Sequence, residues 1–363
     1  MGTTQLWASY IGYIDQAVLL NNRSNITISL KENIELLDEV VVVGYSAQKK
    51  VNLTGSVASV NSDVLAARPI HNAVTGLQGS LPGVSITNTT SRPGDNNTSI
   101  RIRGIGTLNN SNPLILIDGV EGNINTLNPS DIESVSVLKD AASSAIYGSR
   151  AANGVILVTT KKANKDMTPT ITYSGFFALQ TPTALPEMCD AVEYLTLLKE
   201  ATANVGKPWG YTQEDVDAVI NRTDLNNRAN VNWVDELYRS TAPQHGHNVS
   251  LNGGSKSLGY YLSYGNLSTS GLFVGNGYHA SRNNLRVKVT TTMLDRVKID
   301  ANFGYTDVDN WTPASSDSSS DGLFYKALRS SPLTPVRFTD GGWGYGGSSA
   351  NPIAIIYDGG FIN

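Results

Sequence analysis

Residues 138–162 read LKDAASSAIYGSRAANGVILVTTKK and combine a short helix, a glycine turn and an apolar strand. Asp140 stands where it can cap the helix, which Gly148 is expected to end in a left-handed turn. After a second glycine, Gly154, come Val155 to Val158, a run too short for a helix and too continuous for a surface strand. The stretch therefore predicts a compact helix, turn and buried strand within a domain of mixed α and β structure.

The residues before this stretch predict the rest of that domain. Strands are expected at Val51–Val60, Val84–Thr87, Ile100–Arg103, Leu114–Ile117 and Val135–Leu138, with a short helix over Asn72–Gln78. Alternation places Ile100 and Ile102 on one face of their strand and Arg101 and Arg103 on the other. Glycines 104 and 106 permit sharp turns after it, and Asp118-Gly119 closes the Leu114–Ile117 strand. A small sheet with short helices and many charged faces follows.

From Met167 onward the pattern changes to long alternation of apolar and polar residues. About five strands of about ten residues each are expected, and each has one apolar and one polar face, as in a tilted strand that crosses a membrane. They centre on Ile171–Leu179, Val249–Leu251, Leu258–Tyr264, Leu285–Val289 and Val297–Tyr305.

The connections between these strands alternate in length. Gly253–Ser257 and Thr290–Asp295 are tight turns, whereas residues 180–246 form a long connection with helices expected at Ala191–Thr202 and Glu214–Asn221. Outer-membrane barrels have short turns on one side and long loops on the other, so the asymmetry favours a membrane barrel over a soluble one.

Composition narrows the function classes. Net charge is -4, without a long basic run, which argues against nucleic acid as a partner. No window approaches the roughly 18 apolar residues of a membrane helix. Cys189 is the single cysteine, so no disulfide framework is expected, and the first residues do not read as a secretory signal, which suggests a piece of a longer precursor.

A run of four valines at Val40–Val43 predicts a strand of high β-propensity between two domains. Such a strand can add to the edge of another protein's sheet, with backbone hydrogen bonds supplying affinity. An ordinary strand of the preceding domain is the alternative.

Three segments together resemble the SusC/RagA family of TonB-dependent outer-membrane transporters. They are LDEVVVVGYSAQKK at Leu37–Lys50, IRIRGIGTLNNSNPLILIDGV at Ile100–Val120, and DAASSAIYGSRAANGVILVTTK at Asp140–Lys161. The resemblance covers nearly the whole chain.

The resemblance implies four parts. Residues 1–36 are expected to be a remnant of a carboxypeptidase-regulatory-like β-sandwich, 37–46 the TonB box and linker, 47–163 an α+β plug domain, and 164–363 the first antiparallel strands of an incomplete transmembrane β-barrel. The TonB box would comprise Asp38, Glu39, Val40, Val41, Val42, Val43, Gly44 and Tyr45. The plug motifs would comprise Arg101, Arg103, Gly104, Gly106, Asp118, Gly119, Asp140, Tyr147, Gly148, Arg150 and Gly154.

Other site patterns are weaker. The glycine clusters lack the spacing of nucleotide-binding loops and fit turns better. His245 and His247 share a strand face without an evident third metal ligand, and Asp317–Asp321 lacks the glutamate of a calcium loop. Trp343, Tyr345 and Tyr357 could stack on a ligand, although ordinary loop packing explains them equally well. Neither a catalytic set nor a cofactor is expected, and the chain is not expected to be an enzyme.

The expected function is uptake of an oligosaccharide or oligopeptide across the cell outer membrane, gated by the plug and energised by periplasmic TonB. The resemblance adds a SusD-like surface lipoprotein and outer-membrane lipids as partners. Five strands cannot close a barrel, so the chain alone is not expected to transport. A β-rich adhesion or binding module without transport is the alternative.

Overall fold

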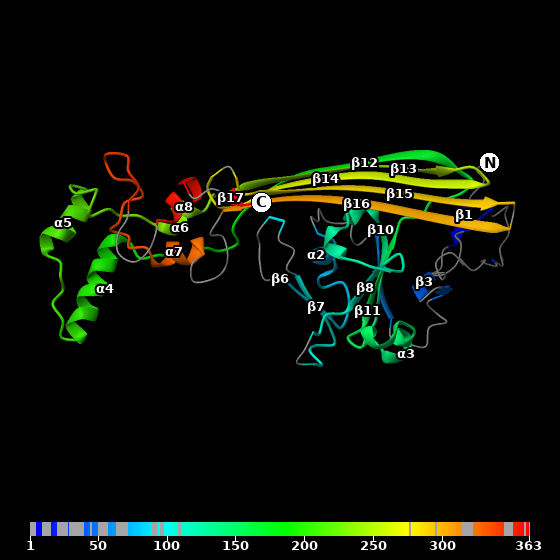
Figure 1. Cartoon of the computed structure of the whole chain (residues 1–363), viewed down its shortest axis with the longest axis horizontal. Coiled ribbons are helices and arrows are strands. Elements are labelled where there is room, and N and C mark those ends of the chain that lie inside the picture. Colours follow the sequence, from blue (N-terminus) through cyan, green and yellow to red (C-terminus); the bar gives the residue numbers. More distant parts are fainter. Residues whose placement is uncertain are drawn as a thin grey trace. The chain divides into compact units, whose positions relative to one another are not determined.

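The computed structural model describes residues 5–8, 16–19, 28, 40–43, 46–49, 57–62, 72–88, 93–94, 98–107, 110–275, 277–294, 296–313, 322–344, 351–358 and 361–362. These form two compact units, one made of Met1–Thr89 and Thr98–Lys161 and the other of Thr90–Asn97 and Lys162–Asn363. Figure 1 shows both units, coloured along the sequence.

A five-stranded sheet organises the first unit, in the order β5-β10-β11-β8-β9. These strands are β5 (Val57–Asn61), β8 (Leu114–Ile117), β9 (Val120–Glu121), β10 (Ile132–Leu138) and β11 (Val155–Thr160). Strand β11 lies between antiparallel β10 and parallel β8, and Val155 to Val158 are all buried. The prediction of a continuously buried strand is confirmed, because a central strand with both faces covered has no polar side.

A short helix and a second sheet complete the core of the first unit. Helix α2 (Ala73–Leu77) begins at Asn72, whose side chain accepts a hydrogen bond from the Val74 N–H. Strands β6 (Val84–Asn88) and β7 (Thr98–Ile102) pair with each other, and Ile100 and Ile102 turn into the core as the alternation predicts. Short 3-10 helices η3 (Ile124–Thr126) and η4 (Pro129–Asp131) lead into β10.

The helix predicted from Asp140 to Gly148 differs in part from expectation. Helix α3 (Ala141–Ser144) passes directly into the 3-10 helix η5 (Ala145–Ala151), and the first helical stretch ends at Gly148, whose backbone is not helical, as predicted. Gly148 bends the chain inside η5, at φ 67° and ψ -153°, a conformation that essentially only glycine adopts. Asp140 occupies the cap position, but its side chain makes no capping hydrogen bond.

Two hairpins precede the sheet. Strand β1 (Gln5–Ala8) pairs with β2 (Gln16–Leu19), and β3 (Val40–Val43) pairs with β4 (Ser46–Lys49), both antiparallel. The β1–β2 hairpin falls in the expected sandwich remnant, and that assignment stays a prediction. The predicted strand at Val40–Val43 is present.

Five long antiparallel strands form an open sheet in the second unit. They are β12 (Met167–Gln180), β13 (Ala242–Gly254), β14 (Leu258–Ser270), β15 (His279–Met293) and β16 (Val297–Pro313), and the short β17 (Phe361–Ile362) pairs with the end of β16. Each strand has 13 to 17 residues, longer than the ten or so predicted. The strand around Val249 has 13 residues, as many as its neighbour β14. It was predicted to be shorter because His245 and His247 interrupt its apolar face.

Helices gather at the end of this sheet where the long connections leave it (Figure 1). The first connection carries α4 (Ala191–Asn204), α5 (Gln213–Asn221) and α6 (Trp233–Leu237), and the chain after β16 carries α7 (Leu323–Arg329) and α8 (Pro352–Asp358). The first two match the predicted helices. Among the described residues, no helix has the length and apolar character needed to cross a membrane.

Candidate functional site

Charged side chains of the expected plug motifs pair with one another around α3 and η5. Arg103 lies 2.6 Å from Asp140, and this ion pair explains why the Asp140 carboxylate does not cap α3. Ser143 and Ser144 hydroxyls donate instead to the Asp140 carbonyl oxygen, each at 3.0 Å. The structure thus joins β7 to the start of α3 through two residues that the sequence had singled out separately.

A second ion pair links η5 to β9. Arg150 contacts Glu121 at 2.9 Å, and both side chains are more than half exposed. An exposed pair of this kind contributes little stability. Glu121 was not among the predicted residues, because only the antiparallel β8–β9 turn brings it within reach of Arg150.

Asp118 ties the turn after β8 to the end of β11. Its two carboxylate oxygens accept hydrogen bonds from Thr160, one from the backbone N–H at 2.9 Å and one from the hydroxyl at 2.6 Å. Thr160 is fully buried. Asp118 has φ 49° and Gly119 φ 89°, so the turn itself uses left-handed backbone at both positions. This pairing fixes the position of β8 against β11.

Other predicted plug residues take structural positions. Arg101 donates to the Asn112 side chain at 2.5 Å and to the Ile100 carbonyl at 2.9 Å, and Tyr147 packs against a small apolar cluster around Leu138 and Leu157. Gly104 has φ 90° with open space around it, and Gly106 also has open space. The contacts of Arg101 and Tyr147 are structural contacts within the first unit.

The segment predicted to be the TonB box lies partly within the described residues. Val40, Val41, Val42 and Val43 form β3, whereas Asp38, Glu39, Gly44 and Tyr45 lie outside the described residues. Strand β3 pairs along one edge with β4, from Val40 opposite Lys49 to Val43 opposite Ser46. A partner strand would therefore add to its other edge or replace β4.

Trp343 and Tyr357, predicted as ligand contacts, come together near α8. Their rings stack with centroids 5.9 Å apart and planes 24° apart. The Arg337 guanidinium lies 3.5 Å from the centre of the Trp343 ring, and the indole N–H donates to Asp358. Tyr345 and residues 317–321 lie outside the described residues. Trp343 is half-buried against apolar neighbours, whereas Tyr357 is exposed, so of these two rings Tyr357 offers more accessible surface to a ligand.

The connections at this end of the sheet share two apolar clusters. The larger, which we call the connection core, joins residues from α6, the β14–β15 connection, α7 and α8: Trp233, Leu237, Phe273, Tyr278, Leu323, Ala327, Ile353 and Ile356. Tyr238 packs edge-on against Phe273 at 5.0 Å, and burial raises the pKa of its hydroxyl. The smaller cluster joins α4 and α5 through Leu195 and Val219.

An ion pair steadies α5. Asp215 lies 2.8 Å from Arg228, and its side chain accepts a hydrogen bond from the Thr212 N–H at 2.7 Å. The hydrogen bond from the Thr212 N–H is the largest cause that lowers the pKa of Asp215 below its usual value; burial opposes it, and Arg228 lowers the pKa further. Sequence reasoning predicted α5 but not this pair.

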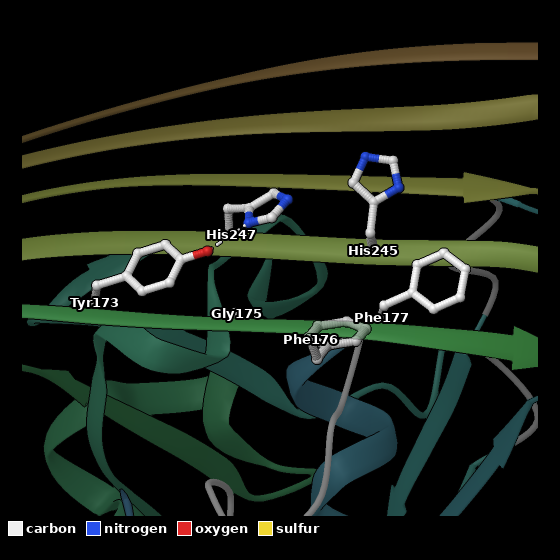
Figure 2. A pocket seen from close by; sticks show the side chains of 6 residues that line it. All are labelled: Tyr173, Gly175, Phe176, Phe177, His245 and His247. Carbon is white, nitrogen blue, oxygen red and sulfur yellow. Dashed lines mark hydrogen bonds between the residues drawn. The ribbon is translucent and has the colours of Figure 1, made fainter.

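His245 and His247 lie on the apolar face of β13, with their rings 5.7 Å apart. Figure 2 shows them beside Tyr173 and Phe177 of the adjacent strand β12. Within the described residues, no cluster of three or more histidine, cysteine or acidic side chains has the geometry to hold a metal ion. The neighbouring aromatic residues were not predicted as a site, because their pairing depends on the register between β12 and β13.

Comparison with known proteins identifies the family. Residues 49–155 match the TonB-dependent receptor plug domain. The chain is 32% identical over 362 residues to TonB-dependent receptor P26 of Formosa agariphila, covering 95% of this chain and 34% of that protein. It is 40% identical over 275 residues to TonB-dependent receptor SusC of Bacteroides thetaiotaomicron, covering 73% of this chain and 25% of that protein.

A solved structure agrees with these relatives. The RagAB peptide importer in its open-open state superposes with a TM-score of 0.67 at 26% identity, over 86% of this chain and 37% of the importer chain. The chain thus spans about a quarter to a third of the length of these two receptors. Members of this family are transporters and not enzymes. The chain is therefore a SusC/RagA-like TonB-dependent receptor that carries the plug domain and part of the barrel.

Proposed function

We propose that this chain forms the gate and the first wall strands of a transporter that takes up an oligosaccharide or an oligopeptide across the outer membrane. TonB-dependent receptors reside in that membrane, and the two substrate classes are those that the resemblance to the SusC/RagA family implies. The RagAB structure that superposes with this chain is a peptide importer, which supports the oligopeptide class. The observation that carries the proposal is a valine strand, β3, in a hairpin that precedes the five-stranded sheet of the first unit.

The five wall strands supply the second support. One end of the sheet carries the long β12–β13 connection, the intermediate β14–β15 connection of residues 271–278 and the segment after β16. The other end carries tight turns between β13 and β14 and between β15 and β16. A wall with this asymmetry presents its long connections to the outside and its turns to the periplasm. A surface lipoprotein similar to SusD is the expected partner over the long connections, as the two-component RagAB complex suggests.

Uptake would require TonB to pair with β3 as an added strand and pull on the plug. Backbone hydrogen bonds supply most of the affinity of such pairing, so a strand that lacks N–H groups cannot be captured. The β3–β4 hairpin adds a condition: β3 must offer its other edge or release β4. Ligand arriving at the outside is proposed to favour that release.

A pair of double-proline variants in the intact transporter tests this mechanism. Val41→Pro with Val42→Pro removes two donors from β3 itself and is expected to abolish energised uptake while leaving ligand binding to cells intact. Ala47→Pro with Gln48→Pro breaks the same hairpin from the β4 side but leaves β3 available, so uptake is expected to persist. Unchanged uptake in the β3 variant would exclude TonB capture of this strand, and binding with no energised uptake in the wild type would favour the adhesion alternative.

A further inference from the structure

The apolar face of β12–β16 changes character along the strands. The register aligns side chains of this face into lines across the sheet, and one line is wholly apolar or aromatic: Tyr173, Val249, Tyr264, Leu285 and Tyr305. The next line toward the long connections, two residues further along each strand, is polar apart from one glycine: Gly175, His247, Asn266, Asn283 and Asp307. The apolar belt therefore ends between these lines on β13 to β16.

The height of the belt fits a bilayer. On β16 the apolar face runs from Val297 to Tyr305, a distance of eight residue steps that spans about 27 Å along the strand at about 3.4 Å per step. A strand tilted by about 40° then covers about 21 Å along the membrane normal, close to the band of about 25 Å on outer-membrane barrels. Tyrosines at the belt's edge, three of the five residues in the last apolar line, suit the interface with the headgroups.

A shallow groove of about 520 Å³ lies where the belt ends on β12 and β13. The depression exists because Gly175 has no side chain. Tyr173 and Phe177, which are 63% and 69% exposed, lie on either side of it (Figure 2). A side chain at Gly175 would fill the groove, because its Cβ would lie 2.7 Å from the Tyr173 hydroxyl. His245 and His247 line the groove from β13.

The imidazoles give the groove hydrogen-bond donors. The Tyr173 hydroxyl lies 2.9 Å from His247 Nδ1, and the two rings stack with centroids 6.3 Å apart. When the hydroxyl donates this bond, the His247 proton resides on Nε2, which then faces outward as a donor. The carboxylates on the same side of the sheet, Asp307 and Asp309, stand on β16, three strands and about 14 Å from β13. The groove therefore combines aromatic walls and N–H donors without an acidic residue in its lining.

We propose that this groove binds the phosphate-bearing headgroup of an outer-leaflet lipid. The proposal rests on the proposed function, since it needs the apolar face to contact the membrane. Its position at the edge of the belt places it at headgroup level, and its place on the apolar face sets it apart from a substrate path along the polar face. The aromatic walls suit the glycerol or sugar next to the phosphate, and the histidines suit the phosphate oxygens.

Native mass spectrometry of the intact transporter tests the groove. After delipidation, three lipids are added in separate arms: lipid A, phosphatidylglycerol and neutral diacylglycerol. Either phosphate lipid is expected to be retained at least tenfold more strongly than diacylglycerol, and the stronger arm identifies the source of the phosphate. His245→Ala with His247→Ala, and separately Gly175→Leu, are expected to reduce retention about tenfold. Asn266→Ala with Asn283→Ala, in the same polar line on β14 and β15, serves as the control and is expected to bind as the wild type does.

Two outcomes overturn the proposal: equal retention of diacylglycerol, or an equal loss in the Asn266 and Asn283 control. Spin labels attached to single cysteines in a Cys189→Ser background distinguish a failure of the groove proposal from a failure of the proposed membrane wall. Labels at Leu262 and Asn266 are expected to be accessible to oxygen and to a water-soluble nickel complex, respectively. If Leu262 is reached by the nickel complex, the membrane wall itself is wrong. If the labels behave as expected but no phosphate lipid is retained, only the groove is wrong.

Discussion

Gly154 is the residue on which the packing of the plug sheet depends most directly. Its backbone has φ 88°, its N–H donates to the Ala151 carbonyl at 2.9 Å, and its own carbonyl accepts from the Leu114 N–H at 3.1 Å. A Cβ there would lie 2.7 Å from Ile102 Cδ1 and 3.1 Å from the Leu138 carbonyl oxygen. The turn before β11 therefore needs glycine for its conformation and for its space.

Gly154→Ala is expected to loosen β8 and β11 in the intact transporter. Left-handed strain alone costs of order 1–3 kcal/mol, and the clash with Ile102 and Leu138 adds to it. Gly104→Ala is the matched control, because Gly104 has φ 90° but open space around it. Hydrogen exchange of the β8 and β11 amides should rise clearly more in the first variant than in the second. Equal exchange in the two would show that the contacts add nothing to the strain.

For single residues, the sequence predicted which positions matter more reliably than it predicted their contacts. Arg103, Asp118 and Asp140 were singled out, yet their partners were not foreseen, whereas the break in the helix at Gly148 was predicted. The cap assigned to Asp140 followed local preference, and a residue 37 positions earlier in the chain, Arg103, outcompeted it for the carboxylate. Local patterns do not contain such tertiary partners.

At the scale of elements, α5 carries a pH-dependent contribution to stability. The Thr212 N–H and Arg228 stabilise the ionised Asp215 carboxylate, so its pKa is lower in the folded protein than the ordinary 3.8. A carboxyl whose pKa is lowered by folding stabilises the folded state above the unfolded pKa. That contribution is lost as the pH falls below 3.8 and through the folded pKa.

Pepsin cleavage within residues 190–230 of the intact transporter measures this loss. Protection should fall as the pH decreases from 4 to 2. Asp215→Asn should already be less protected than the wild type at pH 4 and should approach it at pH 2. Asp217→Asn, on the same helix and hydrogen-bonded to Gln213, controls for loss of a charge and should follow the wild type at each pH. If Asp217→Asn behaves like Asp215→Asn, the effect belongs to the charge of the helix and not to the pair with Arg228.

Elements of the second unit were predictable to different degrees. Alternation located all five long strands and their faces, since a half-buried sheet repeats every two residues whatever its neighbours are. The strands were predicted to end too early, because the polar residues beyond the apolar belt, such as Asn266 and Asp307, resemble loop residues. Helices α4 and α5 have capping boxes at Asp190 and Thr212, whereas α6 has only five residues and little periodicity.

At the scale of the whole molecule, the long connections form packed structure and not separate loops. The connection core draws side chains from α6, the β14–β15 connection, α7 and α8, segments separated by long stretches of sequence. The sequence does not predict this core, because nothing local to any one of these segments shows that they share it. If these segments share a core, a substitution that destabilises one segment must also destabilise the others.

Trp233→Ala tests that coupling. Trp233 is 2% exposed, and its indole N–H donates to the Ser331 carbonyl at 2.9 Å. Its removal is expected to cost about 3–5 kcal/mol of local stability. In the intact transporter, hydrogen exchange should therefore quicken in α7, some 90 residues later in the chain, and in residues 271–275, as well as in α6. Trp209→Ala, in the smaller cluster of α4 and α5, is the matched control and should leave α7 unchanged. Faster exchange confined to α6 would mean that the connections move independently. Coupled exchange would mean that a partner or ligand that orders one connection orders the others with it, because the same buried side chains stabilise them all.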